Sequence, residues 1–367
     1  MRYCKHCVMP DTRPYIRFND EDVCYPCLAA EKHKTTDWKQ RWLELEQLAE
    51  THRGRNGDYY DCIIAASGGK DSWYQTYIMK EKLGMNPLLV SIDNYSWTET
   101  GKQNWANLKE VFGVDAMVIQ PNQNVQRGID RQSFFKYGWT NWLFDKAIYA
   151  VPAQLSVKLG IPLVVYGEDT NYLYGGPHVD ETPDAKKQFT NDVAKPLSFD
   201  VWGYPLKDLN TIVEPDLKYT QPIFLSYYVP WSAYEHVKWA RTRGFKTLDD
   251  TGEWHRDGYL TQYEQIDSVG YLTKKWLMFP KYGHQRVTES ASIEVREGRM
   301  TRDEAVDVVL SEDWKMDRRM MLDFIRYIDV TEEQFWLVAD GIANLDIVEK
   351  RDGNWRLKKD VEENLRG

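Results

Sequence analysis

The stretch Ser67-Gly68-Gly69-Lys70-Asp71-Ser72 decides how this chain folds. It follows residues 62–66, an apolar and partly β-branched run that is typical of a strand buried on both faces of a parallel sheet. It opens residues 73–83, where apolar side chains recur at helical spacing, and Gly84 stands where a left-handed C-cap would end a helix. The sequence therefore predicts a strand, a tight glycine turn and a helix.

A turn of this kind can hold phosphate. Two adjacent glycines let the backbone approach a ligand closely, and the free N–H groups at the start of the helix point outward at the positive end of its dipole. Lys70 and the hydroxyls of Ser67 and Ser72 can add donors, whereas Asp71 suits a Mg²⁺ ion better than a direct contact with an anion. An ordinary serine-glycine turn is the alternative interpretation.

Strands and helices alternate from residue 59 to about residue 250, which indicates an α/β domain with a doubly wound parallel sheet. After the strand at 62–66, the apolar runs predict further strands at 88–93, 116–119, 163–166 and 223–225. Helical patterns separate them, ending at Gly113, spanning about 141–159 with a bend at Pro152, and spanning about 232–243.

Polar side chains follow two of the other strands. In open sheets of this kind, ligands bind outside the carboxyl ends of the strands. Asp93 is placed there to meet ribose or adenine, and Gly167 leads into Glu168 and Asp169, which can hold Mg²⁺ or orient an acceptor. The alternative for these carboxylates is a solvated strand end or the N-cap of the next helix.

Four of the five cysteines lie in residues 1–35, as Cys4-x2-Cys7 and Cys24-x2-Cys27. This spacing predicts a zinc ribbon in which two pairs of thiolates close a tetrahedral, structural site. Two disulfides are the alternative, which the lack of a secretion signal disfavours. Residues 36–58 read as a connecting helix and a loop.

Two later regions complete the expected organisation. Residues 171 to about 230 form a long aromatic insertion, running through Pro177-His178 and Trp202-Gly203-Tyr204-Pro205, which we interpret as an acceptor-binding lid or an oligomer contact. Residues 251–367 read as mainly helical. Within them, residues 281–286 form a small basic and aromatic cluster that can approach phosphates, although a lone histidine such as His284 is more often structural.

Composition sets outer limits on function. The chain has 367 residues, a net charge of −9, 42% hydrophobic and 28% charged residues, as expected of a soluble globular protein of two or three parts. The acidic balance argues against a large nucleic-acid footprint. We find neither an apolar run long enough to span a membrane nor a signal peptide, and we expect a cytoplasmic protein.

The glycine turn resembles the PP-loop, S-G-G-x-D-S, of the ATP pyrophosphatases, whose fold is of the adenine nucleotide alpha hydrolase type. The order of four-cysteine ribbon, S-G-G-K-D-S, G-E-D strand end, aromatic insertion, K-Y-G-H-Q-R and helical tail is similar, over nearly the full length, to bacterial N-acetyl sugar amidotransferases of surface-polysaccharide and nonulosonic (pseudaminic or legionaminic) acid biosynthesis. The ribbon and the PP-loop are the specific parts of this resemblance.

The resemblance implies that a sugar acetamido group is converted to an acetamidino group through an adenylylated imidate, with ATP, Mg²⁺ and structural Zn²⁺ as cofactors and AMP and pyrophosphate as products. The implied roles are as follows: catalysis by Lys70, Asp71 and Asp169; ATP or pyrophosphate binding by Ser67, Gly68, Gly69, Lys70, Asp71, Ser72, Asp93 and Gly167; acceptor binding by Glu168, Tyr172, Tyr174, His284 and Arg286; Mg²⁺ binding by Asp71 and Asp169; and Zn²⁺ binding by Cys4, Cys7, Cys24 and Cys27.

The source of ammonia is a separate question. A glutaminase needs an activated cysteine, and the cysteine outside the ribbon, Cys62, falls inside a predicted buried strand. The resemblance implies a separate glutaminase, similar to the glutaminase subunit of imidazole-glycerol-phosphate synthase and its channel-forming partner, and a nucleotide- or lipid-linked N-acetyl sugar. A homo-oligomer is possible, and no nucleic acid is expected.

Two other functions stay open. Some tRNA sulfurtransferases also combine an N-terminal four-cysteine zinc site with S-G-G-K-D-S, but that chemistry uses cysteines near the PP-loop, and Cys62 alone is available here. A zinc-ribbon adaptor that has lost its enzymatic activity is the non-enzymatic alternative, against which Ser67, Asp71 and Ser72 argue.

Overall fold

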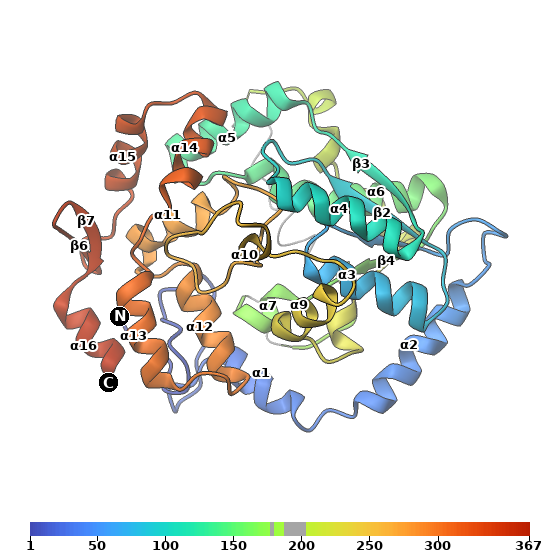
Figure 1. The fold of residues 1–367 in the computed structure, drawn as a ribbon, viewed down its shortest axis with the longest axis horizontal. Helices are drawn as coiled ribbons and strands as arrows, with labels where there is room; N and C mark the ends of the chain where they lie inside the picture. Colours follow the sequence, from blue (N-terminus) through green and yellow to red (C-terminus); the bar gives the residue numbers. More distant parts are fainter. Residues whose placement is uncertain (177–179, 187–202) are drawn as a thin grey trace.

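The computed structural model describes residues 1–176, 180–186 and 203–367 (Figure 1). Pro177, His178 and Trp202 of the predicted aromatic insertion lie outside the described residues. In the described parts of the chain, no helix combines the length and the apolar character needed to cross a bilayer.

A parallel sheet of five strands forms the centre of the fold, as the sequence predicts. Its strand order is β3-β2-β1-β4-β5, and all neighbours pair in parallel. The strands are β1 (Cys62–Ala65), β2 (Pro87–Ile92), β3 (Asp115–Ile119), β4 (Leu163–Tyr166) and β5 (Gln221–Phe224). Because the chain leaves β1 toward β2 and returns on its other side as β4, the order reverses between β1 and β4.

Helices cover both faces of this sheet (Figure 1). Ile64 of β1 belongs to the core formed with α3 (Lys70–Thr76), α4 (Glu99–Phe112) and α9 (Ala233–Arg241). The adjacent Ile63 belongs to the opposite core, formed with α5 (Gln123–Tyr137) and α6 (Trp142–Leu159). Successive side chains of a strand point to opposite faces, so a strand that is apolar throughout serves both layers. The sheet is therefore doubly wound.

The helix after the glycine turn changes its hydrogen bonding midway. It begins as α3 and continues as a π-helix, η1 (Tyr77–Lys82). Gly84 follows with a φ of +62°, as the expected left-handed end requires. A π-helix adds one residue per turn, which spacing of apolar residues over so short a segment does not reveal.

The N-terminal region contributes α1 (Tyr25–His33) and α2 (Trp38–His52), of which α2 is the predicted connecting helix. The insertion between β4 and β5 begins with α7 (Thr170–Tyr174) and also contains short 3₁₀ turns, Leu206–Asp208, Asn210–Ile212 and Leu217–Tyr219, with a fourth, Leu225–Tyr227, directly after β5.

The last third of the described chain is mainly helical. Its helices are α10 (Leu248–Thr251), α11 (Thr273–Tyr282), α12 (Arg286–Arg296), α13 (Arg302–Glu312), α14 (Arg318–Ile328), α15 (Glu332–Gly341) and α16 (Lys359–Arg366). An antiparallel hairpin of β6 (Val348–Arg351) and β7 (Asn354–Leu357) interrupts them and was not predicted. Its turn, Asp352-Gly353, has φ values of +51° and +76°, as a tight primed hairpin turn requires.

The C-terminal helices pack directly on the sheet domain. Phe134 of α5 lies 5.3 Å from Phe324 of α14 and 5.5 Å from Phe335 of α15, measured between ring centroids. One buried apolar cluster runs from Ile64 in the sheet to Leu365 in the last helix. The helical region therefore shares its core with the sheet.

Two glycines provide opposite tests of this backbone. Gly113 ends α4 with a φ of +56°, and a methyl group there would meet nothing within 4 Å, so Gly113→Ala should destabilise through backbone strain alone, by about 1 kcal/mol. Gly341 is the last residue of α15, and a methyl group there also meets nothing within 4 Å, so Gly341→Ala should stabilise by about 0.5 kcal/mol. Denaturant midpoints of the two variants check this, and shifts of the same sign would contradict it.

Candidate phosphate-binding site and zinc centre

The glycine turn at the carboxyl end of β1 is built to leave backbone donors free. Gly68 has a φ of +84°, and a methyl group there would lie 3.2 Å from the Cα of Trp105. Gly69 caps α3 without a side-chain hydrogen bond to its first N–H groups. Ser72 Oγ accepts a hydrogen bond from the Ser67 amide at 2.9 Å, which closes the loop on itself. The Gly69 amide donates to Ser67 Oγ at 3.3 Å, so the N–H groups left for a ligand are those at the start of α3. The turn therefore combines a close backbone approach with an uncapped helix start, which is what a phosphate group needs.

Asp71 is held between two basic side chains. Its Oδ2 accepts a hydrogen bond from Lys70 Nζ at 2.8 Å, and its Oδ1 lies 2.7 Å from His236 Nδ1 on α9. An ionised carboxylate only accepts hydrogen bonds, so Nδ1 of His236 carries the proton. Burial alone would raise the pKa of Asp71, but Lys70 and His236 outweigh it and hold that pKa well below its usual range. Each oxygen keeps a further lone pair, so Asp71 can still ligate Mg²⁺.

His236 is itself fixed by aromatic rings. Tyr74, one turn after the phosphate loop, stacks on the imidazole at 4.0 Å with an interplanar angle of 19°. Nε2 of His236 is buried without a hydrogen-bond partner among the described residues. The sequence predicted the helix that carries His236 but not this residue, because nothing in a pattern of helical spacing links it to Asp71, 165 positions earlier.

Glu168 lies beside this group from the next strand. β4 pairs with β1, so the carboxyl end of β4 places Gly167, Glu168 and Asp169 next to the glycine turn. Burial and the charge of Asp71 raise the pKa of Glu168 to about 7, against the opposing effects of Lys70 and Arg286. Asp169 instead caps α7, accepting hydrogen bonds from the amides of Asn171 at 3.0 Å and Tyr172 at 3.3 Å.

Arg286 completes the basic side of the site from the start of α12. Its guanidinium contacts Glu264 at 2.7 Å and Glu289 at 3.0 Å. It also lies 5.5 Å from the ring centre of Tyr174 on α7. Burial would lower the pKa of Arg286, but Glu264, Tyr174 and Glu289 hold it well above the usual range. The residue is a permanent cation near Glu168.

Glu289 extends this charge network to the N-terminal region. Besides Arg286, it pairs with Lys275 of α11 at 3.0 Å and with Arg13 of the ribbon. Burial would raise its pKa, and the three cations hold it well below the usual range. The ribbon is thereby connected to the surroundings of the phosphate loop through a buried carboxylate.

The remaining predicted residues lie in distinct surroundings. Asp93, at the carboxyl end of β2, accepts hydrogen bonds from Trp97 Nε1 and Gln120 Nε2, both at 2.6 Å. The ring of Tyr172 lies 5.2 Å from that of His33 in α1, away toward the ribbon. His284 is fully buried, and burial lowers its pKa to about 3, so it is a neutral interior side chain.

Further groups of the site come from a segment without regular structure between α10 and α11. It supplies Glu264 and also Asp267, whose pKa burial raises to about 6 although Lys70 and Arg256 oppose the rise. The charge of Glu264 helps to keep the pKa of the buried Lys70 raised, against the effect of burial. No periodic pattern marks residues in such a segment, so their place in the site could not be predicted from the sequence.

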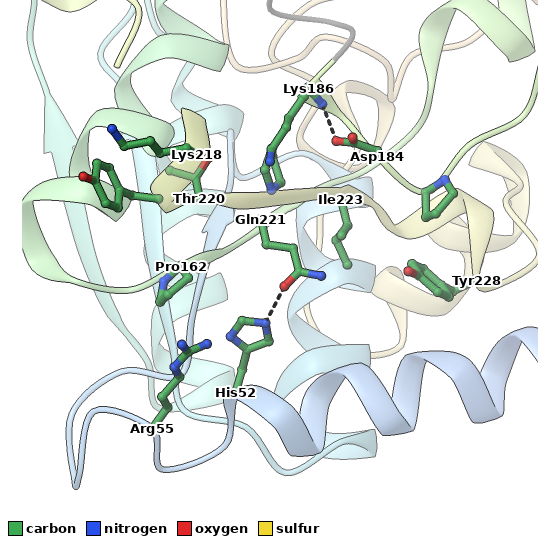
Figure 2. Close-up of a pocket in the computed structure, with 13 residues that line it drawn as sticks. His52, Arg55, Pro162, Asp184, Lys186, Lys218, Thr220, Gln221, Ile223 and Tyr228 are labelled. Atoms are coloured by element: carbon green, nitrogen blue, oxygen red, sulfur yellow. Dashed lines mark hydrogen bonds between the residues drawn. The ribbon is translucent and has the colours of Figure 1, made fainter. Parts of the chain in front are cut away.

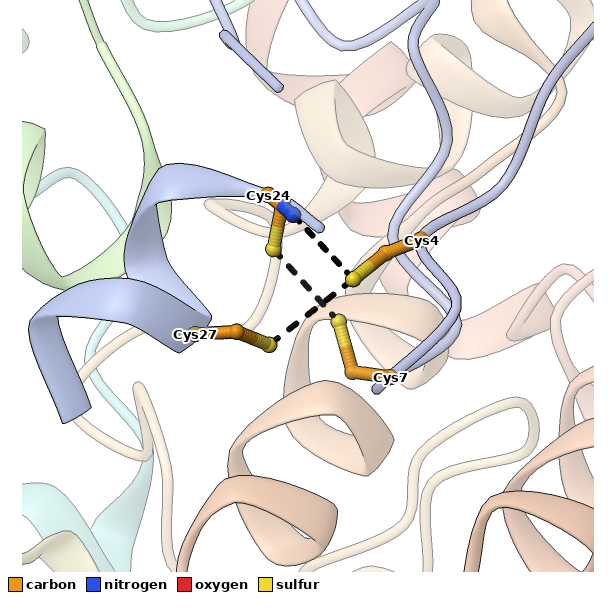
Figure 3. Close-up of side chains that lie close together, drawn as sticks. All are labelled: Cys4, Cys7, Cys24 and Cys27. Atoms are coloured by element: carbon orange, nitrogen blue, oxygen red, sulfur yellow. Dashed lines mark hydrogen bonds between the residues drawn. The ribbon is translucent and has the colours of Figure 1, made fainter. Parts of the chain in front are cut away.

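The four N-terminal cysteines converge on one point (Figure 3). Their sulfur atoms lie within 4.8 Å of one another, with Cys4 and Cys27 3.9 Å apart and Cys7 and Cys24 3.7 Å apart. Tetrahedral zinc with Zn–S bonds of 2.3 Å needs sulfurs about 3.8 Å apart. All four are free, buried thiols, which argues against the disulfide alternative. The donor set fits a structural zinc ion.

A cavity of about 630 Å³ lies at the opposite, amino edge of the sheet (Figure 2). Pro162, before β4, and Gln221, at the start of β5, line it, and Gln221 Oε1 accepts a hydrogen bond from His52 Nε2 at 2.9 Å. β4 and β5 therefore separate this cavity from the phosphate loop, and the groups described above are on the other side.

The C-terminal region of the chain is similar to a known protein family. Residues 257–362 match the model of a family described as LPS biosynthesis protein WbpG-like, C-terminal domain. This matched region contains Glu264, which lies near Lys70 of the glycine turn, and Arg286, which lies near Glu168. The C-terminal region of the chain thus resembles a part of lipopolysaccharide biosynthesis proteins.

Two further similarities are more limited. An uncharacterized protein of Methanocaldococcus jannaschii, MJ1599, is 32% identical over 117 residues, which cover 32% of this chain and 42% of that protein. The NMN synthetase of Francisella tularensis superposes with a TM-score of 0.28 at 12% identity, over 59% of this chain and 91% of its own. So loose a superposition carries no argument, and the fold rests on the sheet topology of the chain itself.

The zinc centre predicts a simple analytical result. Purified protein should contain about one zinc ion per chain, because a four-thiolate site binds a single ion. Cys24→Ser should lose most of that zinc, whereas Cys62→Ser, which changes the thiol buried in β1, should keep it. Elemental analysis of the two variants and the parent checks this. Equal zinc content in Cys24→Ser and the parent would contradict the assignment.

Proposed function

We propose that the protein is an ATP-dependent amidotransferase of surface glycan biosynthesis, which converts the acetamido group of a sugar into an acetamidino group with ammonia as the nitrogen donor. One observation carries the proposal. The region that matches the lipopolysaccharide biosynthesis family contributes Arg286 and Glu264 to the surroundings of the phosphate loop at the carboxyl edge of the sheet. A polysaccharide-related region and a phosphate-binding turn then serve one site.

The carbonyl oxygen of the acetamido group must first be converted into a leaving group, because an amide carbonyl is a poor electrophile. In the first step, the carbonyl oxygen of the acetamido group attacks the α-phosphorus of ATP, and pyrophosphate leaves. In the second, ammonia attacks the carbon of the resulting imidate ester, AMP leaves with the oxygen, and the nitrogen gives up a proton. The amide C–O bond is thus exchanged for a C–N bond, without any oxidation or reduction.

The residues of the site suit these two steps. The backbone N–H groups at the start of α3, together with Lys70, can bind the departing pyrophosphate. Bound Mg²⁺ would neutralise phosphate charge, and Asp71, which is 28% exposed, is the carboxylate that can reach it. Asp93 lies at the same sheet edge, where it can meet the nucleoside. Asp169 then acts as a positioning residue, because it caps the helix that carries Tyr174.

Glu168 is the residue suited to take the proton from the attacking nitrogen. A general base works best when its pKa is close to the working pH, and burial and Asp71 bring the pKa of Glu168 to about 7. Arg286 and Tyr174, on the same side of the site, can contact the acceptor sugar. His284 is buried away from solvent, so we assign it packing rather than acceptor binding.

The ammonia should come from another protein. Cys62 is fully buried in β1, and burial raises the pKa of its thiol far above the usual range, so it is neither exposed nor ionised as a glutaminase nucleophile must be. The same property argues against tRNA thiolation, which needs a reactive cysteine near the loop. A separate glutaminase with a channel-forming partner remains part of the proposal.

The products test the proposal directly. With a nucleotide- or lipid-linked N-acetyl sugar, ATP, Mg²⁺ and an ammonium salt, we expect AMP and pyrophosphate in equal amounts and a sugar whose mass falls by the difference between an oxygen atom and an NH group. Glutamine should not replace ammonium, and Cys62→Ala should retain activity. Chromatography and mass spectrometry read both outcomes. Release of ADP and orthophosphate, or use of glutamine by the chain alone, would contradict the proposal.

The pH dependence tests Glu168. Because the base must be deprotonated, turnover measured at a constant concentration of free NH₃ should rise as the pH passes through about 7, the value to which burial and Asp71 raise the pKa of Glu168. Glu168→Gln should lower turnover by about 10²- to 10⁴-fold and remove this rise. Asp267→Asn is the matched control, since Asp267 is a second carboxylate with a raised pKa, and its variant should keep the rise. An unchanged profile in Glu168→Gln would exclude the role.

A further inference from the structure

Helix α12 joins the phosphate-binding site to the zinc centre. It has 11 residues, so its two ends lie about 15 Å apart. Arg286 and Glu289, at its start, belong to the charge network around the phosphate loop. Val295 and Arg296, at its end, line a cavity of about 230 Å³ together with Cys27. Figure 1 shows α12 beside the N-terminal segment of the chain.

The end of α12 packs against the cysteines themselves. Val295 contacts the buried cluster that Cys4, Cys7, Cys24 and Cys27 form with neighbouring apolar side chains. The guanidinium of Arg296 has a buried Nη1 without a hydrogen-bond partner among the described residues. Arg296 and Cys27 line the same small cavity. An unpaired, buried donor therefore lies next to the metal-binding sulfurs.

A buried zinc site of four thiolates is stabilised by hydrogen-bond donors to its sulfurs. The backbone amides of Cys24 and Met9 already donate to Cys4 Sγ at 3.2 Å and to Cys7 Sγ at 3.5 Å, and a cation would add compensation of charge. Zn²⁺ with four Cys ligands carries a net charge of about −2, and burying charge without compensation is costly. Two other cations near the cysteines are engaged elsewhere. Lys5 is 67% exposed and pairs with Asp22, and Arg302 donates a hydrogen bond to the backbone oxygen of Cys4 rather than to a sulfur. Groups that hydrogen-bond to metal ligands hold them in place and tune the site.

The other end of α12 is tied to the ribbon as well. Glu289 binds Arg13, which also donates a hydrogen bond to the backbone oxygen of Gly175 at 3.3 Å, directly after α7. The ribbon thus contacts α12 at both ends of that helix. Through Arg13 it also contacts the end of α7, the helix that carries Tyr174. α12 therefore links the cysteines to Arg286 through one continuous hydrogen-bonded helix.

We propose that Arg296 is a positioning residue of the zinc centre, donating N–H hydrogen bonds to the zinc-bound thiolates, and that α12 makes phosphate binding at the glycine turn depend on an intact zinc centre. The first part is independent of the proposed function, whereas the second rests on it. The chain then uses its ribbon to order the site as well as to fold.

The test uses full-length protein loaded with zinc or with cobalt. Arg296→Met should release zinc to a chelator about 10- to 100-fold faster than the parent and shift the thiolate-to-cobalt charge-transfer band, because the thiolates lose hydrogen bonds. Arg296→Lys, which keeps a charged donor, should restore most of both properties. Arg299→Met is the matched control, since Arg299 pairs with Glu294 and Glu297 instead of the cysteines, and it should match the parent.

Pyrophosphate titration by calorimetry provides the second arm. Arg296→Met should bind inorganic pyrophosphate about 10-fold more weakly than the parent, and Arg299→Met should bind it equally well. Parent-like zinc release and cobalt spectra in Arg296→Met would overturn the role of Arg296. Changed zinc release with unchanged pyrophosphate affinity would overturn the coupling through α12. A parent protein that binds no pyrophosphate would instead refute the proposed function and leave the zinc results standing.

Discussion

The ion pair between Lys70 and Asp71 is the interaction on which the rest of the site depends. Lys70 is only 7% exposed, and a buried ammonium is costly unless it is paired. Asp71 pairs with it at 2.8 Å and is in turn fixed by His236. Removing one partner of a buried pair commonly costs about 3–5 kcal/mol, because the other charge is left uncompensated. Through His236, α9 therefore helps to hold this ion pair at the glycine turn.

The same requirement explains why distant segments meet at this sheet edge. Each buried charge needs a partner of opposite sign, and the chain supplies these partners from separate elements. Arg286 of α12 is compensated by Glu264 and Glu289, and Glu289 by Lys275 and by Arg13 of the ribbon. A buried network that is fully paired specifies one arrangement of its parts. The sheet, the C-terminal helices and the ribbon are held in a fixed relation by it.

The sequence was sufficient for the parts of the fold that depend on local pattern. Apolar runs located the five strands, and the cysteine spacing located a cluster of four thiols that fits a zinc ion, because periodicity and ligand spacing are properties of short segments. The π-helix after α3 was not predicted, because one extra residue in a turn changes the spacing of apolar residues very little. The hairpin at Asp352-Gly353 could have been predicted from its turn residues, but it was missed because this region was interpreted as helical.

The site was less predictable than the fold. Strand ends correctly suggested which edge carries polar residues, but they do not show which neighbour faces the loop: Glu168 lies beside Asp71, whereas Asp169 caps α7. His236 and Glu264 join the site through tertiary packing alone, from a helix and an irregular segment far along the chain. Only the folded structure brings such residues together.

The central claim is that the glycine turn holds pyrophosphate while the acetamido oxygen is transferred to AMP. Placing a heavy oxygen isotope in the carbonyl of the acetamido group tests this most directly. The account predicts that, after turnover with ATP and ammonium, mass spectrometry finds the label in the phosphate of AMP and none in the sugar product. Label retained in the sugar, or found in orthophosphate, would contradict it.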